Sequence, residues 1–205
     1  LVKGDVANLL TEETPFVYDG AMSSPDIEDT EAFKIKSITT YDLGTTGRKF
    51  VVVAAKGKDG ESTVIVNDLS QGAPEWEKKS LDNIITNDVA LIGATGKAIA
   101  VGQDGEIYQS TDITTPNNWS SLSKIAAFEL ADAQMVTSKI GYAVGSKNNI
   151  LKTIDGGVNW IFQGTPLLNK NWKSVNFINP TNGVAISDDA IVYTSDGTTW
   201  KEVRK

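Results

Sequence analysis

The sequence predicts an all-β fold in which one sheet-forming unit is repeated four times, and three observations support this prediction. Tryptophans recur at intervals of 43, 41 and 40 residues, at Trp76, Trp119, Trp160 and Trp200. An aspartate precedes each tryptophan at short range, at Asp68, Asp112, Asp155 and Asp196. Short apolar runs bounded by Gly, Asn or Asp lie between these markers, which is typical of strands. A period of about 40 to 45 residues is typical of the blades of a β-propeller.

The segments that precede the aspartates align with one another without gaps. Residues 107–112 match residues 150–155 at a shift of 43, and residues 191–196 match at a further shift of 41. The copy in the first unit, residues 63–68, is looser. The repeat therefore extends beyond the tryptophans to the strands and turns around them.

Each unit is predicted to contain four strands joined by tight turns, because paired Asp, Asn and Gly tolerate the positive φ that hairpins need. The clearest strand runs in the first three units are Phe50–Ala54, Lys97–Val101 and Gly141–Val144. The clearest turns are Asp59-Gly60, Asp104-Gly105 and Asn148-Asn149, and Gly93–Lys97 is a further hairpin, because it lacks the full spacing of a phosphate loop. In the fourth unit the predicted strands are Trp172–Ile178, Gly183–Ser187, Ala190–Thr194 and Thr199–Val203.

The predicted blades span residues 32–79, 80–124, 125–164 and 165–205, and residues 1–31 do not fit the repeat. A single blade cannot bury both of its faces, whereas radial packing of blades covers them. We therefore predict a propeller of four or five four-stranded blades, closed by apolar contact between the first and last units or completed within a larger assembly. The N-terminal segment is expected to be an arm that reaches another subunit or a partial blade.

The turn Thr153–Trp160 fits the pattern Ser/Thr-x-Asp-x-Gly-x-x-Trp and resembles the Asp-box, or BNR, repeat. The longer stretch from Gly141 to Trp160 resembles blades of photosystem II stability/assembly factor-like and sialidase-type propellers. Residues 194–200 form a version one residue shorter, and residues 110–119 and 67–76 are degenerate copies. The resemblance implies a structural box whose members are Asp68, Trp76, Asp112, Trp119, Asp155, Gly157, Trp160, Asp196, Gly197 and Trp200.

Composition excludes several functional classes. The chain has 205 residues, no Cys, no His and a formal net charge of −7, so it lacks thiolate chemistry and the commonest general base and metal ligand. We expect no metal, no cofactor and no catalytic residue. Neither nucleic acid nor an anionic membrane is an expected partner, because both bind clustered Lys and Arg.

The low arginine content argues against the activities of the two families that the chain resembles. A sialidase clamps its carboxylate substrate with three arginines, whereas this chain has only Arg48 and Arg204. The arginine-rich patch of a photosystem assembly factor is also missing. A different glycoside hydrolase would need a pair of carboxylates, which 26 acidic residues leave open.

Three residues outside the boxes are candidate contacts for a ligand or partner. Trp172 lies among polar residues at the start of the last unit, where it could stack on a sugar or join the core. Asp188 and Asp189 lie in a predicted hairpin turn, where solvated turn residues are the simpler interpretation.

The leading functional hypothesis is a non-catalytic propeller that acts as a scaffold or binds a protein partner, including a second copy of itself. The alternative is a glycan-binding adhesin or a structural component of a virion surface, and a glycoside hydrolase ranks third. An extracellular, periplasmic or virion-surface location is favoured over the cytoplasm.

Overall fold

The computed structural model describes residues 34–42, 49–56, 62–68, 76–81, 85–113, 115, 118–124 and 128–203. The chain divides into two compact units, residues 1–31 and residues 32–205. The hypotheses about an N-terminal arm or partial blade, and the turn Asp59-Gly60, lie outside the described residues.

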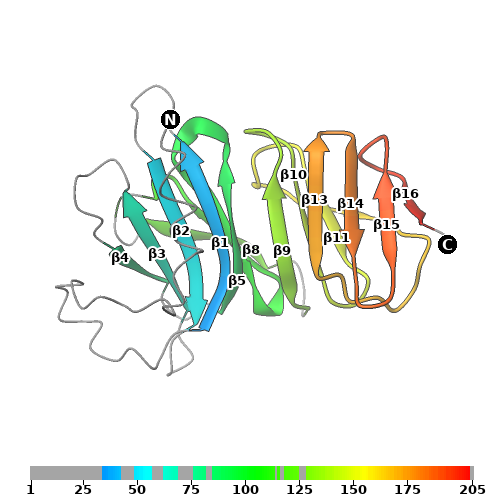
Figure 1. Ribbon diagram of the computed structural model, residues 1–205, viewed down its shortest axis with the longest axis horizontal. Coiled ribbons are helices and arrows are strands. Elements are labelled where there is room, and N and C mark those ends of the chain that lie inside the picture. Colours follow the sequence, from blue (N-terminus) through cyan, green and yellow to red (C-terminus); the bar gives the residue numbers. More distant parts are fainter. Residues whose placement is uncertain are drawn as a thin grey trace, which may run out of the picture. The chain divides into compact units, whose positions relative to one another are not determined.

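The described strands form four antiparallel sheets of four strands, and each sheet follows chain order (Figure 1). The first is β1 (Lys34–Asp42), β2 (Lys49–Lys56), β3 (Ser62–Asp68) and β4 (Trp76–Leu81). The second is β5 (Thr86–Ile92), β6 (Lys97–Gly102), β7 (Glu106–Ser110) and β8 (Trp119–Lys124). The third is β9 (Leu130–Met135), β10 (Gly141–Gly145), β11 (Ile150–Thr153) and β12 (Ile161–Gln163). The fourth is β13 (Ser174–Asn179), β14 (Asn182–Ile186), β15 (Ile191–Thr194) and β16 (Trp200–Glu202).

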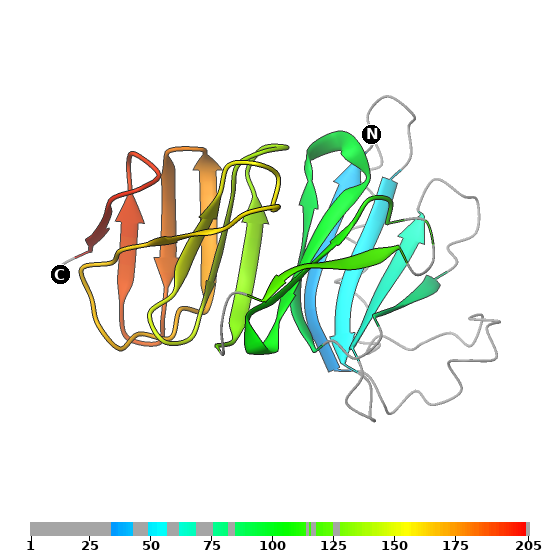
Figure 2. The ribbon, with the colours of Figure 1, turned by 180° about the vertical axis from the view of Figure 1, so that it is seen from behind.

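This architecture confirms the predicted all-β propeller, and we call each sheet a blade. Successive blades contact each other through their first strands, so that β1, β5, β9 and β13 lie side by side in that order. We call these the inner strands. The order of strands from the inner to the outer edge of each blade can be followed in the opposite view in Figure 2.

The predicted hairpins that lie in the described residues are present. Short 3-10 turns, η1 (Gly93–Thr95) and η2 (Gln103–Gly105), join β5 to β6 and β6 to β7. Asp104 and Gly105 both have positive φ, as a tight hairpin requires. In the third blade the positive φ values fall on Lys147 and Asn148, one residue earlier than the predicted pair.

The apolar core lies between successive blades, in three clusters. In the first, Val64 and Val66 of β3 pack against the second blade, on Val89, Ala98, Ala100 and Ile113. In the second, β6 and β7 pack against the third blade; its fully buried members include Ile99, Val101, Ile107, Leu130, Ala143 and Leu151. In the third, β10 and β11 pack against the fourth blade; its members are Tyr142, Val144, Ile150, Trp172, Val175, Phe177, Ala185, Val192 and Trp200.

Aromatic stacking strengthens the third cluster. The rings of Tyr142 and Phe177 are parallel to within 9° with centroids 3.6 Å apart, and Trp200 meets both rings edge-on. The Tyr142 hydroxyl donates to the backbone oxygens of Pro180 and Gly197, so its polar end is satisfied within the core.

The expected contact between the first and last blades does not cover the far face of the fourth blade. Val184, Ile186 and Ile191 on that face are all exposed. The prediction that the ring closes through its own first and last units is therefore wrong for the described residues, because the exposed face has no sheet against it.

Two glycines allow the second strand of a blade to approach the residue before its inner strand. Gly102 lies against the backbone carbonyl of Ile85, and Gly145 lies against that of Glu129; a Cβ at either glycine would overlap the carbonyl. The next residue donates to the same carbonyl: Gln103 N–H to Ile85 at 3.0 Å and Ser146 N–H to Glu129 at 2.9 Å. The absence of a side chain is thus what permits this hydrogen bond.

We expect Gly145→Ala to destabilise the protein by about 1–3 kcal/mol, because the added methyl forces the two backbone segments apart. Gly164→Ala is the matched control, since nothing lies within 4 Å of a Cβ there. Urea denaturation followed by tryptophan fluorescence measures both free energies of unfolding. Equal stability of the two variants would contradict the close-approach argument.

Candidate functional site

The four inner strands line one open cavity of about 470 Å³. Every blade contributes residues to its wall, which are Ile38–Thr40, Asp88–Leu91, Gly93, Asp132–Met135 and Ser174–Asn176. Among the described residues, the wall mixes hydroxyl, amide and carboxylate groups with aliphatic ones and has no aromatic residue. An open cavity where several sheets converge is the candidate binding site of the described chain.

Side-chain acceptors at one register position connect each inner strand to the next. The Ser37 hydroxyl accepts the N–H of Val89 at 3.3 Å. The Asp88 carboxylate accepts the N–H of Ala133 at 2.8 Å. The blades are thus joined by hydrogen bonds at the cavity wall as well as by apolar packing.

The third link of this series joins β9 to β13. Asp132 Oδ2 accepts the N–H of Val175 and the hydroxyl of Ser174, both at 2.7 Å. Gln134 adds a two-point contact, because its Oε1 accepts the Phe177 N–H at 2.6 Å and its Nε2 donates to the Phe177 carbonyl at 3.2 Å. These polar groups hold the blades together.

Asp88 and Asp132 are the acidic pair that the sequence analysis missed. They lie 44 residues apart at equivalent positions of β5 and β9, since each pairs with a valine, Val101 or Val144, in the next strand. Burial and, to a lesser extent, the Asp132 carboxylate together raise the pKa of Asp88 from its usual 3.8 to about 7. The signal in the sequence was the recurrence of an aspartate at the blade period.

A carboxylate with a raised pKa beside a second carboxylate in a cavity is also an arrangement found in glycoside hydrolases. In this cavity both carboxylates accept backbone N–H groups from the following blade. The pair is therefore committed to the junctions between blades.

The turn Thr153–Trp160 is organised by hydrogen bonds within itself. The Thr153 hydroxyl donates to Asp155 Oδ1 at 2.9 Å and accepts the N–H of Gly157 at 2.9 Å. Asp155 also accepts the backbone N–H and the side-chain amide of Asn159, and the backbone N–H in particular lowers its pKa. Trp160 Nε1 donates to the Gly157 carbonyl at 2.8 Å.

The turn Thr194–Trp200 repeats this arrangement with one residue fewer. The Thr194 hydroxyl donates to Asp196 and accepts the N–H of Gly197 at 2.9 Å. The backbone N–H groups of Thr199 and Thr198 donate to Asp196 Oδ1 and hold the pKa of that carboxyl well below its usual range.

The other predicted box residues are less regular. Asp112 accepts the Thr115 hydroxyl at 3.0 Å across a longer turn. Trp119 and Trp160 are partly buried against the first and second clusters, and Trp200 is buried in the third. The side chains of Asp68 and Trp76 lie outside the described residues.

Trp172 is 1% exposed and belongs to the third cluster, so its indole cannot stack on a ligand. Its backbone N–H donates to the Gly145 carbonyl at 3.0 Å, which holds the segment before β13 against the third blade. The suggested contact role of Trp172 is therefore not supported, and core packing, the other interpretation of this residue, is what the structure shows.

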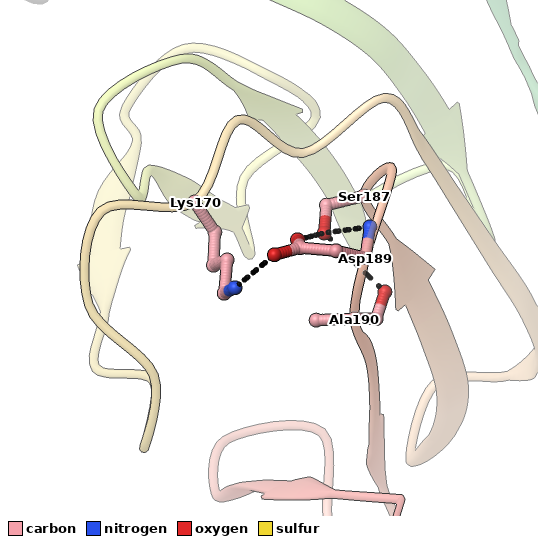
Figure 3. Close-up of polar contacts among 4 residues, drawn as sticks. All are labelled: Lys170, Ser187, Asp189 and Ala190. Carbon is pink, nitrogen blue, oxygen red and sulfur yellow. Dashed lines mark hydrogen bonds and ion pairs between the residues drawn. The ribbon is translucent and has the colours of Figure 1, made fainter.

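Asp188 and Asp189 lie in the exposed turn between β14 and β15, where each pairs with a lysine. Lys170 Nζ lies 2.7 Å from Asp189, whose pKa it lowers, and Lys173 pairs with Asp188. The Ser187 hydroxyl donates to Asp189 at 3.0 Å and receives the Asp189 N–H (Figure 3). The structure brings these residues together as a surface turn, and none of them is among the described residues that line the cavity.

Two further features are absent from the described residues. They contain no group of three or more acidic residues placed to hold a metal ion. They also contain no helix that is long and apolar enough to cross a membrane.

Neither a protein-family model nor a curated protein sequence matches the chain. Solved structures do match. YCF48 from Cyanidioschyzon merolae superposes with a TM-score of 0.59 at 14% identity, over 80% of this chain and 51% of that one. A structure of YCF48 bound to D1 peptide gives a TM-score of 0.52 at 15% identity, over 84% and 67%. U3-55K gives 0.51 at 9% identity, over 85% and 68%.

These superpositions show a shared propeller fold. The chain spans about half the length of the YCF48 structure from Cyanidioschyzon merolae.

We expect Thr153→Val to lower the free energy of unfolding by about 1–3 kcal/mol, because the buried N–H of Gly157 loses its acceptor. Thr153→Ser keeps the hydroxyl and removes one methyl group, so its expected loss is about 0.8 kcal/mol. Chemical denaturation of the two variants tests the hydroxyl separately from the packing. A Val variant as stable as the Ser variant would show that the hydrogen bond contributes little.

The raised pKa of Asp88 predicts that stability falls as pH rises from about 4 to about 7. Between these values the folded state holds a proton that the unfolded state has released, so the free energy of unfolding declines by up to about 1.4 kcal/mol per pH unit. The chain has no histidine to titrate in this window.

Thermal melts between pH 5 and 8 test the assignment. Asp88→Asn should flatten the profile while keeping an acceptor for Ala133, and Asp104→Asn, in an exposed turn, should leave the slope as in the parent. A parent profile that is flat or rises with pH would exclude a raised pKa for Asp88.

Proposed function

We propose that this chain is a non-catalytic propeller module that binds a segment of a protein partner in the cavity between its inner strands. The observation that carries the proposal is the wall of that cavity, to which four separate blades contribute short polar and aliphatic side chains. Such a wall suits an extended peptide, which presents backbone amides and small side chains to several strands at once.

The two acidic groups of the cavity wall are engaged in hydrogen bonds between blades, which supports a binding role over a catalytic one. Asp88 and Asp132 each use a carboxylate oxygen to accept a backbone N–H from the next blade. A catalytic carboxylate must be able to reach a substrate proton or a reacting carbon. Moving either carboxylate toward a substrate would break a junction between blades.

Charge narrows the class of partner. The chain carries a formal net charge of −7, and Asp132 lies in the cavity wall. Complementary charge accelerates association and like charge opposes it, so we infer that the bound segment is neutral or basic.

The comparison with a structure titled YCF48 bound to D1 peptide supports peptide binding as a function that this fold can perform. Glycan binding has less support, because no described residue of the cavity wall is aromatic and Trp172 is buried.

We further infer that the turns Thr153–Trp160 and Thr194–Trp200 are Asp-box turns with a structural role. The carboxylates of Asp155 and Asp196 are satisfied by donors within their own turns. They hold the connection between the third and fourth strands of a blade, at a distance from the inner strands in the sheet order.

Selection of a random peptide display library on the immobilised chain tests the proposal. Enriched peptides should bind the parent and lose about tenfold in affinity, or about 1.4 kcal/mol, on Asn176→Arg, which places a cation and added bulk in the cavity. Lys201→Ala, exposed on β16, is the control and should bind as the parent does. Failure to enrich any peptide would refute the proposal that the cavity is the binding site. Peptides that bind Asn176→Arg and Lys201→Ala with equal affinity would refute it as well.

A further inference from the structure

The exposed face of the fourth blade occupies the same register positions that are completely buried in the two preceding blades. Tyr142 of β10 pairs with Gln134 and Lys152, and Val184 of β14 pairs in the same way with Asn176 and Tyr193. Three positions are related in this manner across the second, third and fourth blades. They are Ile99, Tyr142 and Val184; Val101, Val144 and Ile186; and Ile107, Ile150 and Ile191.

The exposed fractions of these side chains distinguish the fourth blade from the other two. All six members of these series in the second and third blades are 0% exposed, because the following blade covers them. Val184, Ile186 and Ile191 are 42%, 41% and 47% exposed. The fourth blade thus presents the apolar face of an interface that the chain forms three times internally and leaves open a fourth time.

The first blade shows the complementary half of the same interface. The register places Ile38 of β1 at the position of Val89, Ala133 and Val175, which receive the preceding blade. Those three residues are 2%, 7% and 4% exposed, whereas Ile38 is 66% exposed. The backbone register pairs Ile38 with Val53 and Val53 with Ile65, as the fourth blade pairs Val175 with Ala185 and Ala185 with Val192.

We propose that the free face of the fourth blade binds the first blade of a second copy of this chain, head to tail. The occupant follows from continuity with the internal interfaces, because the chain itself carries both halves of the repeated contact. Two copies arranged about a twofold axis would satisfy all four free faces through two identical contacts, which makes a closed assembly. The proposal does not depend on peptide binding, although Ile38 of the receiving face also lies in the wall of that cavity.

The free face also carries a polar group at a position where the preceding blades make a hydrogen bond to the next blade. Gln109 Nε2 donates to the Gly156 carbonyl in the box turn of the next blade, and Lys152 Nζ donates to Gly197 in the same way. Tyr193 occupies the equivalent position on β15, and it is 38% exposed. Its hydroxyl can therefore serve the corresponding turn of an incoming blade.

The mass of the full chain in solution tests the proposal. Light scattering coupled to size exclusion, over a wide range of concentration, should give twice the chain mass of 22.0 kDa. We call the free face of the fourth blade the exit face. Ile186→Lys combined with Ile191→Lys places charges on the exit face, and Ile38→Lys places a charge on the receiving face. Each variant should be monomeric. Ile154→Lys, the same change at an exposed isoleucine of the third blade, should remain a dimer and is the matched control.

Mixing distinguishes a head-to-tail contact from a symmetric one. The two monomeric variants, combined in equal amounts, should form a dimer, because one intact exit face then meets one intact receiving face. A ladder of higher masses that both variants abolish would support the same contact without ring closure. A parent that stays monomeric at every concentration, or an Ile38→Lys variant that still dimerises, would overturn the proposal. Melting curves confirm that each variant is folded.

Discussion

The packing of one sheet face onto the next is the interaction on which the rest of this structure depends. A blade of four short strands has two faces, and neither can be buried within the blade itself. The chain solves this by placing apolar residues at the same register positions of its middle strands, so that Ile99 and Val101 meet the third blade as Tyr142 and Val144 meet the fourth. Every cluster of the core is therefore a junction between two repeats.

The polar groups of the inner strands follow the same logic. Ser37, Asp88 and Asp132 occupy one position in three successive blades, and each accepts a backbone N–H from the next inner strand. These bonds link neighbouring inner strands, and Asp88 and Asp132 also lie in the wall of the cavity that the strands line. The raised pKa of Asp88 is a consequence of this arrangement, because the carboxylate is largely buried and a second carboxylate is near.

A repeat that buries its faces only against neighbours has open ends unless the first and last copies meet. In this chain the exit face of the fourth blade and Ile38 of the first are exposed, although their equivalents elsewhere are buried. The same side-chain chemistry that is core in the third blade is surface in the fourth. Whether such a residue is core or surface is therefore decided by its neighbour and not by its own strand.

The sequence by itself determined the repeated unit, the strands and the hairpins, because these depend on local periodicity and on residues such as Asp104 and Gly105 that suit a tight turn. It also contained the aspartates at positions 88 and 132, although their shared role was not recognised without the pairing registers. Only the tertiary structure decided the environment of Trp172, which follows polar neighbours in the sequence but is buried where its segment docks on the third blade. It alone showed that the fourth blade's far face is uncovered. Burial depends on which sheet lies opposite, and a strand's own sequence does not contain that information.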